Sequence, residues 1–124
     1  MKFLKNTALF CAGGGAYVGL ELLFRGRSHS SMFAAGGLSL LLIGRLEQRH
    51  PELPAGARHL LGAGIITAVE LATGLLVNRD YRVWDYRKVP GNFRGQICPL
   101  LTLLWIPAAA AAGWLYKTLN RVLP

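Results

Sequence analysis

The sequence predicts an all-α protein, an integral membrane bundle of four helices with a structured interfacial loop before the last helix. Two observations predict this class. Hydrophobic residues make up 52% of the 124 residues and charged residues only 16%, a composition that is apolar for a soluble domain. The apolar residues also form four continuous blocks, and nearly all the charge lies between them. Because lipid offers the backbone no hydrogen-bond partner, such runs cross a membrane as helices, and their lack of alternation disfavours β structure.

The blocks predict a single transmembrane domain that covers residues 1–124. An apolar helix of roughly 17 to 25 residues spans a hydrocarbon core of about 30 Å. Three blocks reach this length, whereas the second has about 15 residues, so it is a short or mismatched span or a helix shielded by its neighbours. Four crossings leave both termini on one face. The expected helices cover residues about 7–24, 32–46, 60–77 and 95–116, with the interfacial loop at 79–94.

The first block has two features that need interpretation. Lys2 and Lys5 before an apolar run resemble the start of a signal peptide, but the run continues to Phe24 with a Glu inside it, so we expect a retained helix. The stretch "GGGAYVG" superficially resembles a phosphate-binding loop. No strand precedes it and no Gly-Lys-Ser/Thr follows, so we interpret its glycines as positions where helices pack closely.

Glu70 lies near the middle of the third block. A carboxylate in hydrocarbon costs at least ~2.5 to 3.5 kcal/mol, so it should face protein or water, form a pair or bind a proton. Small and polar residues share its helical face: Ala63, Thr67, Thr73 and Gly74. We expect this face to point into the bundle, where Glu70 is a candidate site for a cation or a proton. The alternative is a buried polar tie that fixes helix register.

Glu21 is the second acid inside an apolar block, and Arg25 follows it by one helical turn. This spacing favours a local ion pair, and a role of both residues in binding a substrate or an ion is the alternative. The stretches "GGGAYVGLEL" (13–22) and "GAGIITAVEL" (62–71) share two glycines, the Glu and the following Leu. These matches predict a parallel pseudo-repeat of two helices each, although shared membrane composition explains them equally well.

The loop sequence "YRVWDYRKVPGNFRGQICP" (81–99) is unusually polar for a connection between two apolar blocks. Trp84 and Tyr86 are expected at the headgroup level, with the ring in the apolar margin and the polar tip in water. Asp85 lies between them, and we expect nearby arginines or backbone N–H groups to hold it. The segment is then either an ordered cap that gates or lines a binding site or an interfacial anchor that orients the last helix.

The second half of this loop contains turn and helix-start signals. Pro90 and the glycine after it predict a turn. Asn92 is expected to cap a helix that starts near Phe93, and it is also a candidate binding residue. Gly95 allows a close approach of the backbone, and Cys98 is expected to be a free, buried thiol.

The net charge is +8, and we expect the Lys and Arg side chains to bind lipid and not nucleic acid. These residues lie at helix ends, where their charged groups can reach anionic lipid headgroups. Each face of the predicted bundle carries half of the 14 Lys and Arg residues, so the positive-inside rule gives no orientation.

The sequence lacks the residue patterns of a metal site, a nucleotide-binding site and a nucleophilic active site. The three histidines have no carboxylate or cysteine companions at ligand spacing, so no metal site is expected. No nucleotide-binding motif is present, so we expect no cofactor, and any ATP hydrolysis would need another subunit. No constellation of Ser, His or Cys nucleophiles accompanies the acids, and we therefore expect no enzyme.

Four motifs follow one another between about Gly64 and Trp105: "ELATGLL", "YRVWDY", "PGNFRGQIC" and "LLW". This ordered series resembles the type IV ABC-transporter permease family of small bacterial membrane proteins, and "GLELLFR" resembles the first helix of that family. The second block departs from the Gly/Pro/Cys-rich stretch that the family usually carries. The positions that match the family pattern are Glu21, Arg25, Glu70, Gly74, Trp84, Asp85, Tyr86, Pro90, Asn92, Gly95, Cys98 and Trp105.

The resemblance implies a multi-pass, transport-type component of a bacterial cell membrane (plasma or inner membrane), with a separate ATPase subunit as a partner. The small-residue faces of its short helices favour a homo-oligomer surrounded by membrane lipids. A non-transporting scaffold or lipid-binding subunit, whose acids only lock the bundle, is the alternative. A small proton-coupled antiporter is a further alternative.

Overall fold

The computed structural model describes residues 2–26, 29–81 and 84–123. The helices in these ranges are α1 (Lys2–Arg25), α2 (Ser30–Arg49), α3 (Ala55–Val77) and α4 (Pro99–Val122). Within the same ranges there is no strand, and Phe93 and Ile97 form an isolated antiparallel bridge in the loop before α4. The predicted all-α class with four helices is therefore confirmed for the described residues.

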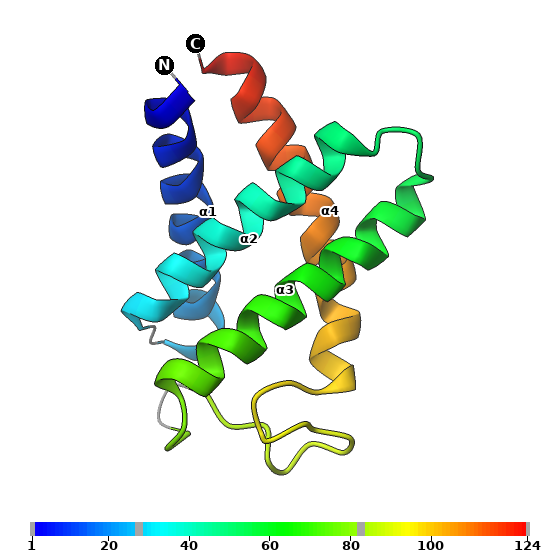
Figure 1. The fold of residues 1–124 in the computed structure, drawn as a ribbon. Helices are drawn as coiled ribbons and strands as arrows, with labels where there is room; N and C mark the ends of the chain where they lie inside the picture. The colour runs from blue at the N-terminus through cyan, green and yellow to red at the C-terminus, as the bar shows by residue number, and fades with distance from the viewer. Residues whose placement is uncertain (1, 27–28, 82–83, 124) are drawn as a thin grey trace.

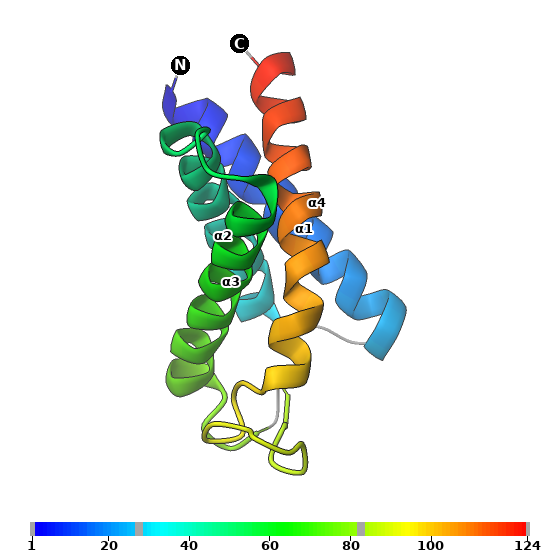
Figure 2. The same cartoon turned by 90° about the vertical axis from the view of Figure 1, so that its right-hand side faces the viewer.

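Helix α2 lies at the centre of the bundle and contacts each of the other three helices. Helix α1 packs mainly on α2, and α4 packs mainly on α3. Helices α1 and α4 meet only over a short stretch, and Figure 2 shows the C-terminal end of α1 turning away from α4. Both termini lie at one end of the bundle and the α3–α4 loop lies at the other, as expected (Figure 1).

Glycines bring α1 and α2 into backbone contact. A Cβ added to Gly13 would lie 2.6 Å from the Cβ of Leu40, and one added to Gly36 would lie 2.5 Å from the Cβ of Tyr17. Neither distance is accessible to real side chains, so glycine is required at both positions. The interpretation of the glycine-rich stretch as a close helix-packing surface is confirmed.

Two of the described helices, α3 and α4, are long and apolar enough to cross a membrane. The sequence predicts four spans, and α1 and α2 do not meet the same criterion over their described residues. In α2, nine residues are buried against neighbouring helices, among them Ser39 and Glu47, and these polar residues lower its hydropathy. This finding favours the alternative of a second helix that is shielded by its neighbours.

Helix α4 begins at Pro99, with Cys98 in an extended conformation at the N-cap. The prediction that Asn92 caps a helix starting near Phe93 is therefore wrong. Pro99 is well suited to the first helical position, because it lacks an N–H and its φ is fixed near the helical value. Cys98 is buried and free, as expected.

Candidate functional site

A cavity of about 930 Å³ lies between α1 and α4. Gly36, Ser39, Leu40 and Ile43 of α2 contribute to its wall, and the α3–α4 loop contributes at one end. Most of the residues that line the cavity are aliphatic, and the polar and aromatic ones are Tyr17, Glu21, Ser39, Tyr81, Trp84, Asp85, Tyr86 and Trp105. Two of the three predicted acids, Glu21 and Asp85, thus border one space.

Glu70 is buried, with 4% of its surface exposed, and its face of α3 points into the bundle as expected. It does not itself line the cavity. Its carboxylate Oε2 accepts a hydrogen bond of 3.5 Å from the Tyr17 hydroxyl, and Tyr17 does line the cavity. The Tyr17 ring also lies 5.9 Å, centroid to centroid, from the ring of Trp105. Tyr17 therefore connects the deepest acid to the cavity wall.

Glu21 lies on α1 one helical turn after Tyr17, and it is partly exposed where it borders the cavity. Its expected partner is Arg25, whose backbone ends α1 but whose side chain lies outside the described part of the structure. The ion pair between them stays a prediction. Glu21 and Glu70 differ in burial, so the two acids of the proposed pseudo-repeat do not occupy equivalent environments.

Asp85 is held by one arginine and by a backbone N–H, as expected. Arg87 donates to its carboxylate from Nε at 2.9 Å and from a terminal nitrogen at 2.8 Å, and the Arg87 backbone N–H adds a third bond of 2.9 Å. These bonds, led by the side-chain bond from Arg87, lower the pKa of Asp85 to about 2. The guanidinium of Arg87 also lies 4.1 Å above the Tyr81 ring. Asp85 therefore stays ionised, and its hydrogen bonds shape the loop.

Trp84 is buried with 4% exposure, so its ring does not have the polar tip in water that the sequence predicts. Its indole joins Met32, Ala35 and Val69 in a core cluster, and Tyr86 packs at the edge of that cluster. The indole Nε1 donates to the backbone carbonyl of Gln96 at 2.9 Å. The loop thus inserts a side chain between α2 and α3.

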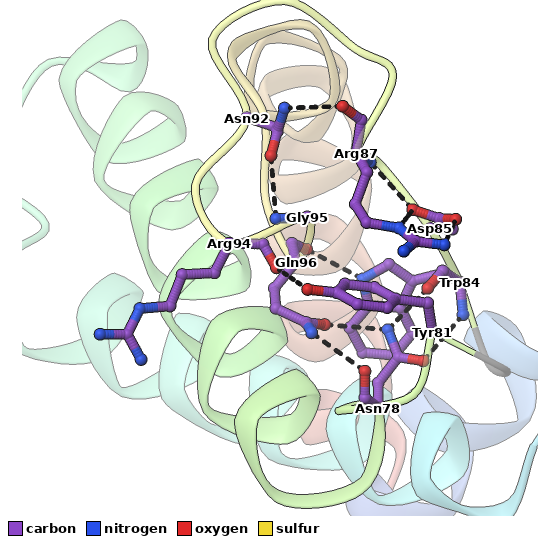
Figure 3. A network of polar contacts seen from close by, with 9 residues as sticks. All are labelled: Asn78, Tyr81, Trp84, Asp85, Arg87, Asn92, Arg94, Gly95 and Gln96. Atoms are coloured by element: carbon purple, nitrogen blue, oxygen red, sulfur yellow. Dashed lines mark hydrogen bonds and ion pairs between the residues drawn. The ribbon is translucent and has the colours of Figure 1, made fainter.

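A buried hydrogen-bond network holds Trp84 in place (Figure 3). The Asn78 amide donates to the Trp84 carbonyl at 2.7 Å and accepts from the Trp84 N–H at 3.2 Å. Asn78 also donates to Gln96 Oε1 at 2.8 Å, and Gln96 Nε2 returns a bond of 3.0 Å to the Asn78 carbonyl. Asn78 is 0% exposed and Gln96 is 2% exposed, so these amides satisfy each other away from water.

Two of the glycines in the family pattern lie at constrained positions in or next to this network. A Cβ on Gly74 would overlap the Gln96 side chain and lie 3.0 Å from the Trp84 ring. Gly95 has a φ of +68°, which favours glycine, and its N–H donates to Asn92 Oδ1 at 2.9 Å. Glycine is therefore needed at both positions, at Gly74 for space and at Gly95 for conformation.

Asn92 and Pro90 act within the loop. The Asn92 amide donates to the carbonyls of Arg87 and Val89 at 3.1 and 2.9 Å. The backbone N–H of Asn92 reaches the Val89 carbonyl at 3.3 Å, which closes the predicted turn over Pro90 and Gly91. Gly91 has a φ of +76°, as a type II turn requires at its third position. Asn92 therefore orders the loop, and it does not line the cavity.

A cluster of ion pairs that was not predicted from the sequence lies toward the end of the bundle opposite the α3–α4 loop. Glu47 of α2 has a side chain that is only 5% exposed, and it forms ion pairs with Arg58 of α3 and, at 3.0 Å, with Lys117 of α4. A Cβ added to Gly113 would lie 2.9 Å from a Glu47 carboxylate oxygen. This carboxylate therefore ties three helices together.

Sequence signals for the missed residues exist but are weak. Asn78 directly follows the third block, and Gln96 lies inside the motif "PGNFRGQIC". Glu47 follows the end of the second block, where an acid usually faces water. Tyr17 is one aromatic residue in a glycine-rich helix, and its pairing with Glu70 joins residues 53 positions apart.

Comparison with protein families identifies a match over most of the chain. The model of the family described as "Putative ABC-transporter type IV" matches residues 22–123. The chain belongs to this family. The part matched to the type IV ABC-transporter family includes Arg25, Glu70, the α3–α4 loop and α4, and Glu21 lies one residue before it. No curated protein and no solved structure was found to match the chain.

Proposed function

We propose that this member of the type IV ABC-transporter family is a membrane-embedded component of a transport system, and that the cavity between α1 and α4 contacts the transported substrate. Family membership and the two span-length apolar helices support a transport role in a membrane. The observation that carries the proposal is the contact of buried Glu70 with Tyr17 on the cavity wall. A carboxylate is retained at such depth at a cost, and a role in binding a cation or a proton explains it.

The proposed location is the cell membrane, with ATP hydrolysis in a separate subunit, because the chain has no nucleotide-binding motif. Large apolar side chains on the outer faces of the helices support contact with lipid or with a second copy of the chain. Examples are Leu23, Leu76, Leu103 and Trp114, which are between 63% and 81% exposed.

Liposomes that contain the purified chain test this proposal. Internal pH is followed with a trapped dye, and uptake of rubidium is followed under an imposed membrane potential. We expect the chain to support proton or cation flux and Glu70→Gln to reduce it at least tenfold, because the amide keeps the shape but loses the charge. Glu52→Gln is the matched control, since Glu52 lies exposed in the α2–α3 connection. Equal flux in both variants would contradict the proposal.

The scaffold alternative is favoured by one observation, namely that Glu47 is engaged in a purely structural ion cluster. If Glu70 were likewise structural, Glu70→Gln would lower the thermal unfolding midpoint in detergent, and no preparation would show flux. Recording unfolding and flux on the same preparations separates the two functions.

A further inference from the structure

We propose that the cavity between α1 and α4 binds a compact, uncharged amphipathic molecule, whose carbonyl group accepts hydrogen bonds from Ser39 and Trp105 and whose hydrocarbon body lies along α4. The inference deepens the proposed function, on which it rests, because it names the class of substrate that the cavity takes. It does not depend on the charge of Glu70.

The cavity is large enough for a small molecule, and its lining is mostly apolar. Its volume of about 930 Å³ lies within the range of roughly 300 to 1,000 Å³ that is typical of such sites. Helix α4 contributes leucine, alanine and tryptophan side chains to the wall, among them Leu104, Ala108 and Ala112. Because an apolar wall gains nothing from contact with a hydrated ion, the ligand needs a substantial hydrocarbon part.

Two polar groups inside this apolar lining have no hydrogen-bond partner among the described residues. One is the hydroxyl of Ser39, a residue of α2 that is 5% exposed, and the other is the indole N–H of Trp105 on α4. Buried polar groups are nearly always paired, and an unpaired one is costly. A ligand can therefore gain a hydrogen bond at each of these groups without displacing an existing one.

The two groups belong to one region of the cavity wall. Trp105 packs against a core cluster that contains Ile43 and Ile66, and Ile43 follows Ser39 by one turn of α2. All of these residues line the cavity. A serine side chain turns about a single bond between staggered positions, so its hydroxyl can be directed to a ligand beside the Trp105 ring.

The two unpaired groups decide which functional group the ligand carries. An indole N–H only donates, so Trp105 requires an acceptor, and the Ser39 hydroxyl can donate as well. A carbonyl oxygen supplies lone pairs for both without bringing a donor of its own. A hydroxyl or an amine on the ligand would add a donor, for which the aliphatic wall of α4 offers no acceptor.

The charged groups at the cavity leave no counter-charge for an ion. No lysine or arginine is among the lining residues within the described ranges. The acids on the wall are Glu21 and Asp85, and both are already engaged, since Asp85 accepts bonds from Arg87 and Glu21 has an interaction within the chain. An ion would lose its hydration in this space without gaining a partner, so the ligand is uncharged.

Equilibrium dialysis with related probes tests the proposal. The purified full-length chain in detergent micelles is dialysed against benzophenone, its methylene analogue diphenylmethane, the anion para-benzoylbenzoate or the cation of para-(aminomethyl)benzophenone, and protein-free micelles correct for partitioning. We expect benzophenone to bind at least fivefold more tightly than each of the other three, because only it combines the acceptor with zero charge. Equal binding of benzophenone and diphenylmethane, or tighter binding of either ion, would overturn the proposal.

Two substitutions identify the donors. Trp105→Phe keeps an aromatic ring but removes the N–H, and Ser39→Ala removes the hydroxyl. We expect each to weaken benzophenone binding at least threefold and to leave diphenylmethane binding unchanged. The matched controls are Trp114→Phe and Ser30→Ala, because these residues are exposed and do not line the cavity. A preference for the ketone that survives both substitutions would refute the assignment of the donors.

Ser39→Ala also separates binding from structure. Because the hydroxyl has no partner among the described residues, its removal should not lower the unfolding midpoint of the ligand-free protein. A lower midpoint would reveal a structural partner and would contradict the assignment of this hydroxyl to a ligand.

A second pair of variants locates the binding. Ala16 of α1 is exposed and borders the cavity, so Ala16→Trp should fill part of the space and abolish benzophenone binding. Ala72 is also exposed but does not border the cavity, and Ala72→Trp is the matched control. Circular dichroism checks that both variants keep their helices. Ketone binding that is unchanged in Ala16→Trp would place the ligand elsewhere.

The dialysis does not depend on transport. Ketone-selective binding together with absent flux would refute the transport function and keep the ligand assignment. Flux that depends on Glu70, without ketone binding, would keep the function and refute the ligand class. Loss of benzophenone binding when dioleoyl phosphatidylcholine is added to the micelles would assign the space to lipid chains and would also refute the ligand class.

Discussion

The side-chain amides of Asn78 and Gln96 hold the α3–α4 loop in its conformation. Asn78 and Gln96 exchange hydrogen bonds in a site where both are almost fully buried, and the backbone of Trp84 completes the set. In such a site each group depends on its partner, because water cannot replace a lost bond. The stability of the loop is therefore most sensitive at these residues and less sensitive at its exposed arginines.

Gln96→Leu should lower stability by about 1 to 3 kcal/mol, because it leaves a buried Asn78 N–H without its acceptor. The measurement is the unfolding midpoint in detergent by circular dichroism. Gln48→Leu is the matched control, since Gln48 is exposed on α2 and should change stability little. A midpoint that moves equally in both variants would show that the buried network contributes nothing.

Residue-level prediction from the sequence succeeded where the signal was local. The inward face of Glu70 follows from the small residues at helical spacing around it, and burial confirms it. Asn92 was assigned wrongly because turns and helix caps both favour a side-chain amide at their first position. The burial of Trp84 could not be predicted because its partner Gln96 is 12 residues away, and no spacing rule connects the two.

Helix α3 contains one glycine position that has space for a larger side chain and another that does not. Gly64 has nothing within 4 Å of an added Cβ, whereas the corresponding position at Gly74 is filled by Gln96. The two glycines are alike in sequence context, and only the packed structure separates them. Helix α2 shows the same limitation, since its burial against three neighbours could not be read from its hydropathy alone.

Alanine at these two glycines should have opposite effects. Gly64→Ala should stabilise the chain by up to about 1 kcal/mol, because alanine favours the helix. Gly74→Ala should destabilise it by about 1 to 3 kcal/mol, because the added methyl displaces the Gln96 side chain. Unfolding midpoints of the pair in the same detergent give the comparison. A shift in the same direction for both would contradict the packing at Gly74.

At the scale of the whole molecule, two polar clusters fix the bundle near its ends. The Glu47 cluster joins α2, α3 and α4, and the Asn78–Trp84–Gln96 network joins α3 to the loop that leads into α4. The overall class and the shared end of the termini follow from composition and block order. The cavity does not, because it results from the divergence of α1 and α4, which depends on how α1 crosses its neighbours (Figure 2).

Stability of the bundle should fall with acid through Glu47. Burial raises the pKa of this carboxyl, but Lys117 and Arg58 outweigh it, and the folded-state pKa is lower than usual. A lowered pKa contributes stability that is full above the unfolded value of about 4.3 and is lost as the pH falls below it. The unfolding midpoint should therefore drop between about pH 5 and pH 3.

Glu47→Gln tests this assignment. The variant should unfold at a lower temperature at neutral pH and should show a smaller drop on acidification. Asp85, with its pKa of about 2, also loses stabilising interactions in acid, but mainly at lower pH and in both proteins. An acid drop that is the same in the wild type and in the variant would assign the effect to other groups.

The common end of the two chain termini has a practical consequence for measuring topology (Figure 1). In a bundle that crosses the bilayer, a membrane-impermeant reagent added outside intact cells reaches tags at both ends or at neither. Partial labelling to the same extent at both ends would then mean that molecules insert in two opposite directions, which the equal distribution of cations does not prevent.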